Sequence, residues 1–277
     1  GLEYMISTKI KSLIEIDKKT VGLMNLDTES ELKTDNLSAQ LNQHYNFRTI
    51  DPSANIPESI DVLLVSATKD TVDTNTVSNL RNFLNTGKKV FIAQSGVNAD
   101  IKTQQAGPLS SNIFELLNEF SLDLQKNMVL DAKCGNVQVQ EQRGIFLMNR
   151  PVEYPLFPTI DTFNGSDSLS GVVVNELEQV LLLFPSEIKI DTSVNEKVEK
   201  VSTLFTSSNN SGIMESNLVL SPDPQQNPFL RMLGQPGKIL AATSRLNTGG
   251  ELMLVSDSRF LSDEGGMSIP VNMIFMM

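Results

Sequence analysis

The chain offers one thiol and one imidazole as candidate catalytic groups, Cys134 and His44. A cysteine hydrolase or amidotransferase would need both, because an adjacent base activates the nucleophilic thiol. Cys134 lies in the sequence AKCGN, at the start of an irregular region rather than on a sharp strand-to-helix turn. His44 ends an amphipathic helical segment. We therefore interpret both as ordinary loop and helix-end residues.

A serine nucleophile is also poorly supported. Ser95 follows an apolar, strand-like run in the order Gln94, Ser95, Gly96, where a nucleophile could be exposed. The glycine expected two residues before such a serine is missing, and no second histidine is available as a base. Turn formation is the simpler role for Ser95 and Gly96.

Acidic residues cluster in SDSRFLSDEGG, where Asp257, Asp263 and Glu264 follow a predicted strand. Carboxylate oxygens bind hard cations, but this spacing matches no calcium loop and histidine ligands are lacking. We expect Asp257 or Ser258 to cap a helix start, and we predict no metal site. Neither G-x-G-x-x-G nor G-x-x-x-x-G-K-[ST] occurs, so no nucleotide or other cofactor is predicted.

Composition excludes one class of partner. The 277 residues include 33 acidic and 22 basic side chains, for a net charge of −11, which repels nucleic-acid phosphates. Cys134 is the single cysteine, so an internal disulfide is excluded. No apolar run reaches the roughly 18 to 20 residues of a membrane span, and no signal peptide is evident. Both ends look cut from a longer protein, which we expect to be membrane-anchored through segments outside this chain.

Residues 56–96 give the clearest indication of which elements hold these side chains. Residues 62–65 and 90–93 are short apolar runs typical of strands, and the segment between them has apolar residues at helical spacing. Asp73 is predicted to cap this helix and Gly87 to end it. Ligand-binding loops of a parallel β-α-β unit lie at the carboxyl ends of its strands. A ligand site is therefore expected near residues 66–70 and 94–98.

The rest of the first 130 residues also alternates strand and helix. Strands are predicted over 20–26 and 47–50, and helices over 8–16, 34–45 and 113–120. Asn112 and Glu115 are predicted to form a capping box for the last of these helices. This alternation predicts an α/β fold of flavodoxin-like or class I amidotransferase-like character, with a mostly parallel sheet and helices on both faces.

Helical periodicity nearly disappears after residue 130. Between 131 and 215, Gly, Pro, Ser and Asn separate short β-prone runs, which predicts a β-rich insertion or subdomain. Residues 216–277 are predicted to return to the α/β domain that residues 1–130 begin. Their clearest feature is a hairpin of strands 239–244 and 251–256 joined through 247–250, and a closing helix is expected over 268–277.

Three segments resemble the soluble domain of gliding-motility-type ABC transporter auxiliary proteins, the GldG-like family. They are LEYMISTKIKSLIEIDKKTVGLM, IPESIDVLLVSATKDTVDTNTVSNLRNFLNTGKKVFIAQ and ILAATSRLNTGGELMLVSDSRFLSDEGG. The family often has a Gly-His-Gly-Glu turn after its first strand. This chain has Asn-Leu-Asp-Thr-Glu-Ser at 25–30, so only Glu29 of that turn corresponds.

The resemblance implies a fold similar to class I glutamine amidotransferase domains without their catalytic machinery. It implies a non-enzymatic, extracytoplasmic (periplasmic) auxiliary or solute-recognition component of an ABC transport or gliding-motility system. The implied partners are the permease and ATPase subunits, together with an unidentified solute, and the chain would bind no ATP itself.

Candidate ligand or partner residues are chosen by their position at the carboxyl ends of predicted strands. They are Asp27, Thr28, Glu29, Gln94, Ser95, Gly96, Asn98, Asp257 and Ser258. Two alternatives stay open. A pure protein-interaction scaffold predicts a large exposed apolar patch, and a hydrolase or amidotransferase predicts Cys134, His44 or Ser95 in a pocket beside a second catalytic group.

Overall fold

The computed structural model describes residues 18–27, 32–101, 103–143, 146–161, 179–191, 193, 195–223, 227, 229–263 and 265. The helices expected over 8–16 and 268–277 lie outside these residues, as do residues 162–178 of the region predicted to be β-rich. No helix in the described part of the chain is long and apolar enough to span a membrane.

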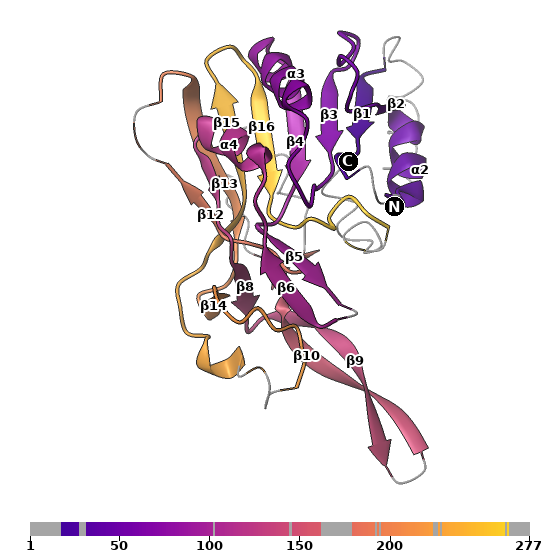
Figure 1. Cartoon of the computed structure of the whole chain (residues 1–277), viewed down its shortest axis with the longest axis vertical. Coiled ribbons are helices and arrows are strands. Elements are labelled where there is room, and N and C mark those ends of the chain that lie inside the picture. Colours follow the sequence, from indigo (N-terminus) through magenta and orange to yellow (C-terminus); the bar gives the residue numbers. More distant parts are fainter. Residues whose placement is uncertain are drawn as a thin grey trace, which may run out of the picture.

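A nine-stranded sheet forms the body of the molecule (Figure 1). Its order is β2-β1-β3-β4-β16-β15-β12-β7, and β13 also pairs with β15. The strands from β2 to β16 are parallel, whereas those from β15 onward pair antiparallel. The bounds are β1 Thr20–Met24, β2 Asn46–Ile50, β3 Val62–Val65, β4 Lys89–Ala93, β7 Leu122–Leu124, β12 Ile188–Ile190, β13 Val198–Thr206, β15 Ile239–Leu246 and β16 Glu251–Val255.

Helices cover both faces of this sheet. Leu37 and Leu41 of α2 (Asp35–His44) pack with Val21 and Leu23 of β1 in one buried cluster. The apolar faces of α3 (Thr74–Asn85) and α4 (Asn112–Glu119) pack in a second cluster with the side chains that point the other way. Alternate strand residues point to opposite faces, so each central strand contributes to both clusters. The predicted α/β class, with a parallel central sheet between helices, is confirmed.

The predicted helix ends hold for α3 but not for α4. Asp73 accepts a hydrogen bond from the Asn75 amide, and Gly87 follows the helix with φ +85°, the left-handed conformation that glycine tolerates. The capping box predicted at Asn112 is wrong, because the N-cap of α4 is Ser111. The Asn112 amide instead donates to the Val72 carbonyl (2.7 Å) and accepts from the Val72 N–H (3.0 Å).

A smaller β-rich part extends from one end of the body (Figure 1). It contains the ribbon of β9 (Cys134–Arg143) and β10 (Phe146–Ile160), which pair antiparallel and project away from the sheet. The remaining elements are β5 Val97–Asp100, β6 Gln105–Pro108, β8 Met128–Asp131, β11 Val180–Leu181, β14 Ser211–Met214 and the 3-10 helix η1 Phe229–Arg231. Residues 131–215 therefore contribute both to this part and, through β12 and β13, to the main sheet.

The hairpin of β15 and β16 packs against the end of α3. Its turn contains Asn247, Thr248, Gly249 and Gly250, as predicted, and Gly249 has φ +87°. A Cβ atom added at the buried Gly250 would lie 2.1 Å from the Leu84 carbonyl oxygen of α3. This helix can therefore approach β16 only because residue 250 has no side chain.

We predict that Gly250→Ala lowers the free energy of unfolding by about 2 to 3 kcal/mol, because its Cβ overlaps backbone atoms that cannot rotate away. Gly107→Ala is the matched control, since a Cβ there meets no atom within 4 Å. Urea unfolding of both variants measures the difference. Equal stability of the two would contradict the close packing of the turn on α3.

Candidate functional site

A cavity of about 270 Å³ opens at the carboxyl edge of the parallel strands. Its walls are the loops that follow β1, β3, β4 and β16, joined by the segment after β11. This is the edge at which open α/β sheets bind ligands. The position predicted from the strand order is therefore the position of the cavity.

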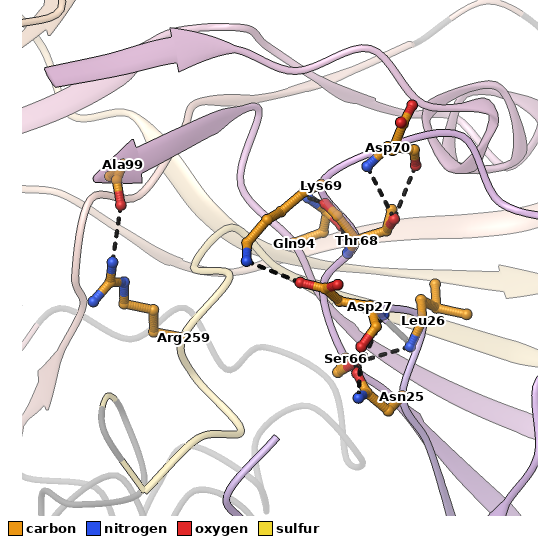
Figure 2. A network of polar contacts seen from close by, with 10 residues as sticks. All are labelled: Asn25, Leu26, Asp27, Ser66, Thr68, Lys69, Asp70, Gln94, Ala99 and Arg259. Atoms are coloured by element: carbon orange, nitrogen blue, oxygen red, sulfur yellow. Dashed lines mark hydrogen bonds and ion pairs between the residues drawn. The ribbon is translucent and has the colours of Figure 1, made fainter. Parts of the chain in front are cut away.

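Hydrogen bonds tie the loop after β1 to the end of β3 (Figure 2). The Ser66 hydroxyl donates to Asn25 Oδ1 at 2.7 Å and accepts the Leu26 N–H at 3.1 Å. Asn25 Nδ2 donates to the Asp27 carbonyl at 2.8 Å. On the rim, the Lys69 ammonium pairs with the Asp27 carboxylate at 3.0 Å. The loop that carries Asp27 is thus held by these polar contacts together with the packing of Leu26 in the core.

Gln94 lies behind the cavity wall and supports it. Its side chain is fully buried, and its Oε1 accepts the Thr68 N–H at 2.8 Å. Its Nε2 donates to the carbonyls of Thr68 (3.1 Å) and Ser95 (2.8 Å). Gln94 therefore satisfies the backbone of two neighbouring loops, and its side chain is not available to a ligand.

Ser95 and Ser258 form a hydroxyl pair in the cavity wall. The Ser95 hydroxyl donates to the Val97 carbonyl at 2.8 Å, so Ser258 supplies the proton of the 2.7 Å contact between the two Oγ atoms. The Ser95 N–H donates to Ser258 Oγ at 2.8 Å. These partners include no imidazole and no carboxylate. Gly96 lies beside this pair but faces the protein interior, where its N–H donates to Ser186 Oγ.

Asp257 is a buried carboxyl group directly below the cavity. Its oxygens accept the N–H groups of Leu183 (2.9 Å) and Arg259 (2.8 Å). Burial raises the pKa of Asp257 to about 6, although these two hydrogen bonds and the Arg259 charge oppose the increase. The helix start expected here is wrong, since residues 258–261 form a turn. Asp257 thus holds the loop that carries Ser258 and Arg259.

Asp263 of the acidic cluster caps a helix that is distant in sequence. Its carboxylate accepts the N–H groups of Asp35 (2.7 Å) and Asn36 (3.2 Å), at the start of α2. Thr34, the N-cap residue in sequence, makes no side-chain cap hydrogen bond. The helix is therefore capped by a residue from the other end of the chain.

The Arg259 guanidinium at the cavity is held in place by two contacts. Its Nη2 donates to the Ala99 carbonyl at 2.9 Å (Figure 2), and its guanidinium lies 5.7 Å from the centre of the Phe184 ring. Phe184 has φ +55°, which is rare for a bulky residue, and it precedes Pro185. The backbone is thus held in an unfavourable conformation at the point where the aromatic ring meets the guanidinium.

The structure separates the residues predicted from sequence into three groups. Asp27, Ser95, Asn98 and Ser258 line the cavity. Gln94, Gly96 and Asp257 support it from behind. Thr28 and Glu29 lie outside the described residues.

The lining residues that were not selected from sequence include Asn25, Ser66, Lys69 and Arg259. Ser66 and Lys69 fall within the predicted loop 66–70, and Arg259 follows the selected Ser258. Their position just after a predicted strand could therefore have identified them. Phe184 gave no such signal, because its contact with Arg259 depends on the tertiary fold.

Cys134 and His44 do not line the cavity. Cys134 begins the β9–β10 ribbon, where burial raises the pKa of its thiol and so disfavours the nucleophilic thiolate. His44 ends α2 and has its ring edge-on to Tyr45. Within the described residues, no group of three or more His, Cys, Asp or Glu side chains is arranged to hold a metal ion.

The fold and the cavity define a mixed α/β domain with a recess, lined by both polar and apolar side chains, at the carboxyl edge of its parallel strands. A family model described as an ABC-type uncharacterized transport system matches residues 18–272. The chain belongs to this family of auxiliary components of ABC-type transport systems. No curated protein matches it in sequence.

Several solved structures are similar to this chain at low sequence identity. The mmIFT52 N-terminal domain is 13% identical, with a TM-score of 0.56 over 92% of this chain and 93% of that one. PurLQS from Thermotoga maritima is 6% identical, with a TM-score of 0.41 over 94% and 96%. A Thermoplasma acidophilum protein described as part of a GMP synthase is 8% identical, with a TM-score of 0.41 over 93% of both chains.

We predict that Asp257 makes the protein less stable as the pH rises from about 4 to about 6. Over that interval the folded state retains a proton that the unfolded state releases, because the folded pKa is about 6 and the ordinary value is 3.8. From pH 4 to pH 7, the stability of the wild type should fall relative to Asp257→Asn by up to about 3 kcal/mol. Urea unfolding at several pH values measures this difference.

Asp51→Asn is the control for this prediction. Hydrogen bonds from the Ser53 side chain and backbone lower the pKa of Asp51, which is exposed, so its contribution to stability has the opposite sign. If Asp257→Asn and the wild type show parallel pH profiles, Asp257 does not titrate in this range.

Proposed function

We propose that the chain is a non-enzymatic, extracytoplasmic component of a GldG-like, gliding-motility-type ABC transport system. In this role its carboxyl-edge cavity recognises a solute, and the domain associates with the permease and ATPase subunits. The observation that carries the proposal is the cavity itself, which a member of an ABC transport family builds from rigid polar loops. The extracytoplasmic position and the gliding-motility type rest on the sequence resemblance.

The hydrogen bonds of the cavity support a role without catalysis. A serine nucleophile needs a base within hydrogen-bond reach. The Ser95 hydroxyl contacts a carbonyl and a second serine instead. Cys134 lies in the ribbon with a raised thiol pKa, which argues against a cysteine nucleophile. Binding rather than bond cleavage is the chemistry that these groups favour.

Coupling to transport would follow from differential affinity. A bound solute can shift a transporter between two states only if the solute-loaded domain contacts one state more tightly than the other. The rigid parallel strands keep the loops of the cavity in fixed relative positions, so an occupied cavity can present a changed surface without unfolding.

A second candidate, a pure interaction scaffold, is favoured by the β9–β10 ribbon. The ribbon projects from the body (Figure 1), and an isolated two-stranded hairpin is marginally stable in water. Met148 on this ribbon is 54% exposed, and burial of its apolar side chain against a partner would be favourable. A protein partner would cover this surface.

The test is cross-linking of the membrane-anchored full-length protein in its native envelope, followed by purification. We expect the permease and ATPase subunits to co-purify. Recovery of neither of them under conditions that preserve the membrane would contradict the proposal. Release of a hydrolysed product by the purified chain would contradict the non-enzymatic role.

Two variants separate solute recognition from scaffolding. In the first, a two-residue turn replaces residues 137–152, which the pairing of Asn136 with Glu153 allows without a change of register. In the second, Arg259→Gln alters the cavity. The scaffold role predicts that only the shortened ribbon loses the transporter subunits. A solute-dependent association predicts that Arg259→Gln also reduces their recovery.

A further inference from the structure

We propose that the cavity binds a small anionic solute, and that the Arg259 guanidinium holds its carboxylate or phosphate group. This inference rests on the proposed solute-recognition role and names the chemical class of the solute. It is argued from the orientation of Arg259, from the state of the neighbouring acidic groups and from the size of the cavity.

Arg259 is oriented before a ligand arrives. Its Nη2 donates to the Ala99 carbonyl at 2.9 Å, and its Cζ atom lies over the Phe184 ring, 5.7 Å from the ring centroid. A guanidinium has five N–H donors in a planar fork that matches carboxylate and phosphate oxygens. Ala99 occupies one of them, which leaves donors for an anion. A pre-oriented fork loses less conformational entropy on binding than a free side chain.

Phe184 is held in a strained backbone conformation. Its φ of +55° is unfavourable for a bulky side chain, and its ring packs against Phe157 (5.0 Å) and Tyr154 (6.2 Å). Strained residues of this kind persist where the surrounding structure determines them, commonly at ligand sites. Here the strain keeps an aromatic surface under the guanidinium. This surface can also contact an apolar portion of the solute.

The acidic side chains near the cavity are already engaged. The Asp27 carboxylate pairs with the Lys69 ammonium at 3.0 Å. Asp257 is below the wall, and its oxygens accept the Leu183 and Arg259 backbone N–H groups rather than the guanidinium. Neither carboxylate therefore occupies the position that a ligand anion would take.

Lys69 supplies a second cation across the cavity from Arg259 (Figure 2). Its side chain is 58% exposed, and its ammonium has donors beyond the one directed at Asp27. The volume of about 270 Å³ is near the lower limit of small-molecule sites. These features fit a compact solute with an anionic group and a short polar body, not a polymer or a lipid chain.

The test is isothermal titration calorimetry of the 277-residue chain with three anionic probes and one neutral probe. The anions are inorganic phosphate, glycerol 3-phosphate and succinate, and glycerol is the neutral match. We expect at least one anion to bind with a Kd below about 1 mM and glycerol not to bind. Preference for glycerol 3-phosphate or for succinate would identify the anionic group as phosphate or carboxylate.

Arg259→Gln should weaken anion binding at least about tenfold, as expected for loss of a charge-assisted bidentate contact. Arg259→Lys, which keeps the charge and loses the fork, should give an intermediate affinity. Lys69→Gln, at an exposed position, should weaken binding less and leave folding intact. Arg245→Gln is the matched control, because Arg245 is exposed on β15 and pairs with Glu199 away from the cavity.

Absence of binding by all three anions up to about 10 mM, with the chain folded, would overturn this inference. So would equal affinities of the wild type, Arg259→Gln and Lys69→Gln. Co-purification of transporter subunits with the full-length protein is a separate measurement and keeps the two proposals distinct. Anion binding without those subunits would contradict only the transport role, and the subunits without anion binding would contradict only the anionic solute.

Discussion

The rest of the structure depends on the pairing of β16 with β4 on one side and with β15 on the other. It joins the parallel half of the sheet, built from the first part of the chain, to the antiparallel half. Leu252 and Leu254 complete the core under α3 and α4, and Val255 completes the core on the face of α2. The same strand carries Ser258 and Arg259 to the ends of β1, β3 and β4. Without it, the cavity would lack one wall.

Several polar side chains in this protein satisfy the backbone of distant segments. Asp263 caps α2, Asn112 pairs with both polar groups of Val72, and Gln94 pairs with both polar groups of Thr68. A buried N–H or carbonyl without a partner costs free energy, so loops that leave a regular sheet need such contacts. This explains why several residues that look chemically capable in sequence support the cavity and do not line it.

The cavity and the projecting ribbon share one aromatic cluster. Phe184 lies beside Arg259 in the cavity wall, and its ring contacts Tyr154 and Phe157 in the β10 strand of the ribbon. Closely packed interiors transmit displacement better than they absorb it. The aromatic cluster therefore links the wall of the cavity to the base of the ribbon.

The sequence by itself determined the local elements, the α/β class and the edge of the sheet at which a site should lie. Apolar periodicity, Asp73 and Gly87 specify α3 through interactions within a few residues, and such interactions can be inferred from spacing. Only the tertiary structure decided how the 131–215 region divides between two places, and which polar residue caps which helix. It also decided that Arg259 would meet Ala99, 160 residues earlier in the chain. Contacts at such separation depend on the complete sheet order, because no local pattern encodes the partner of a side chain across the fold.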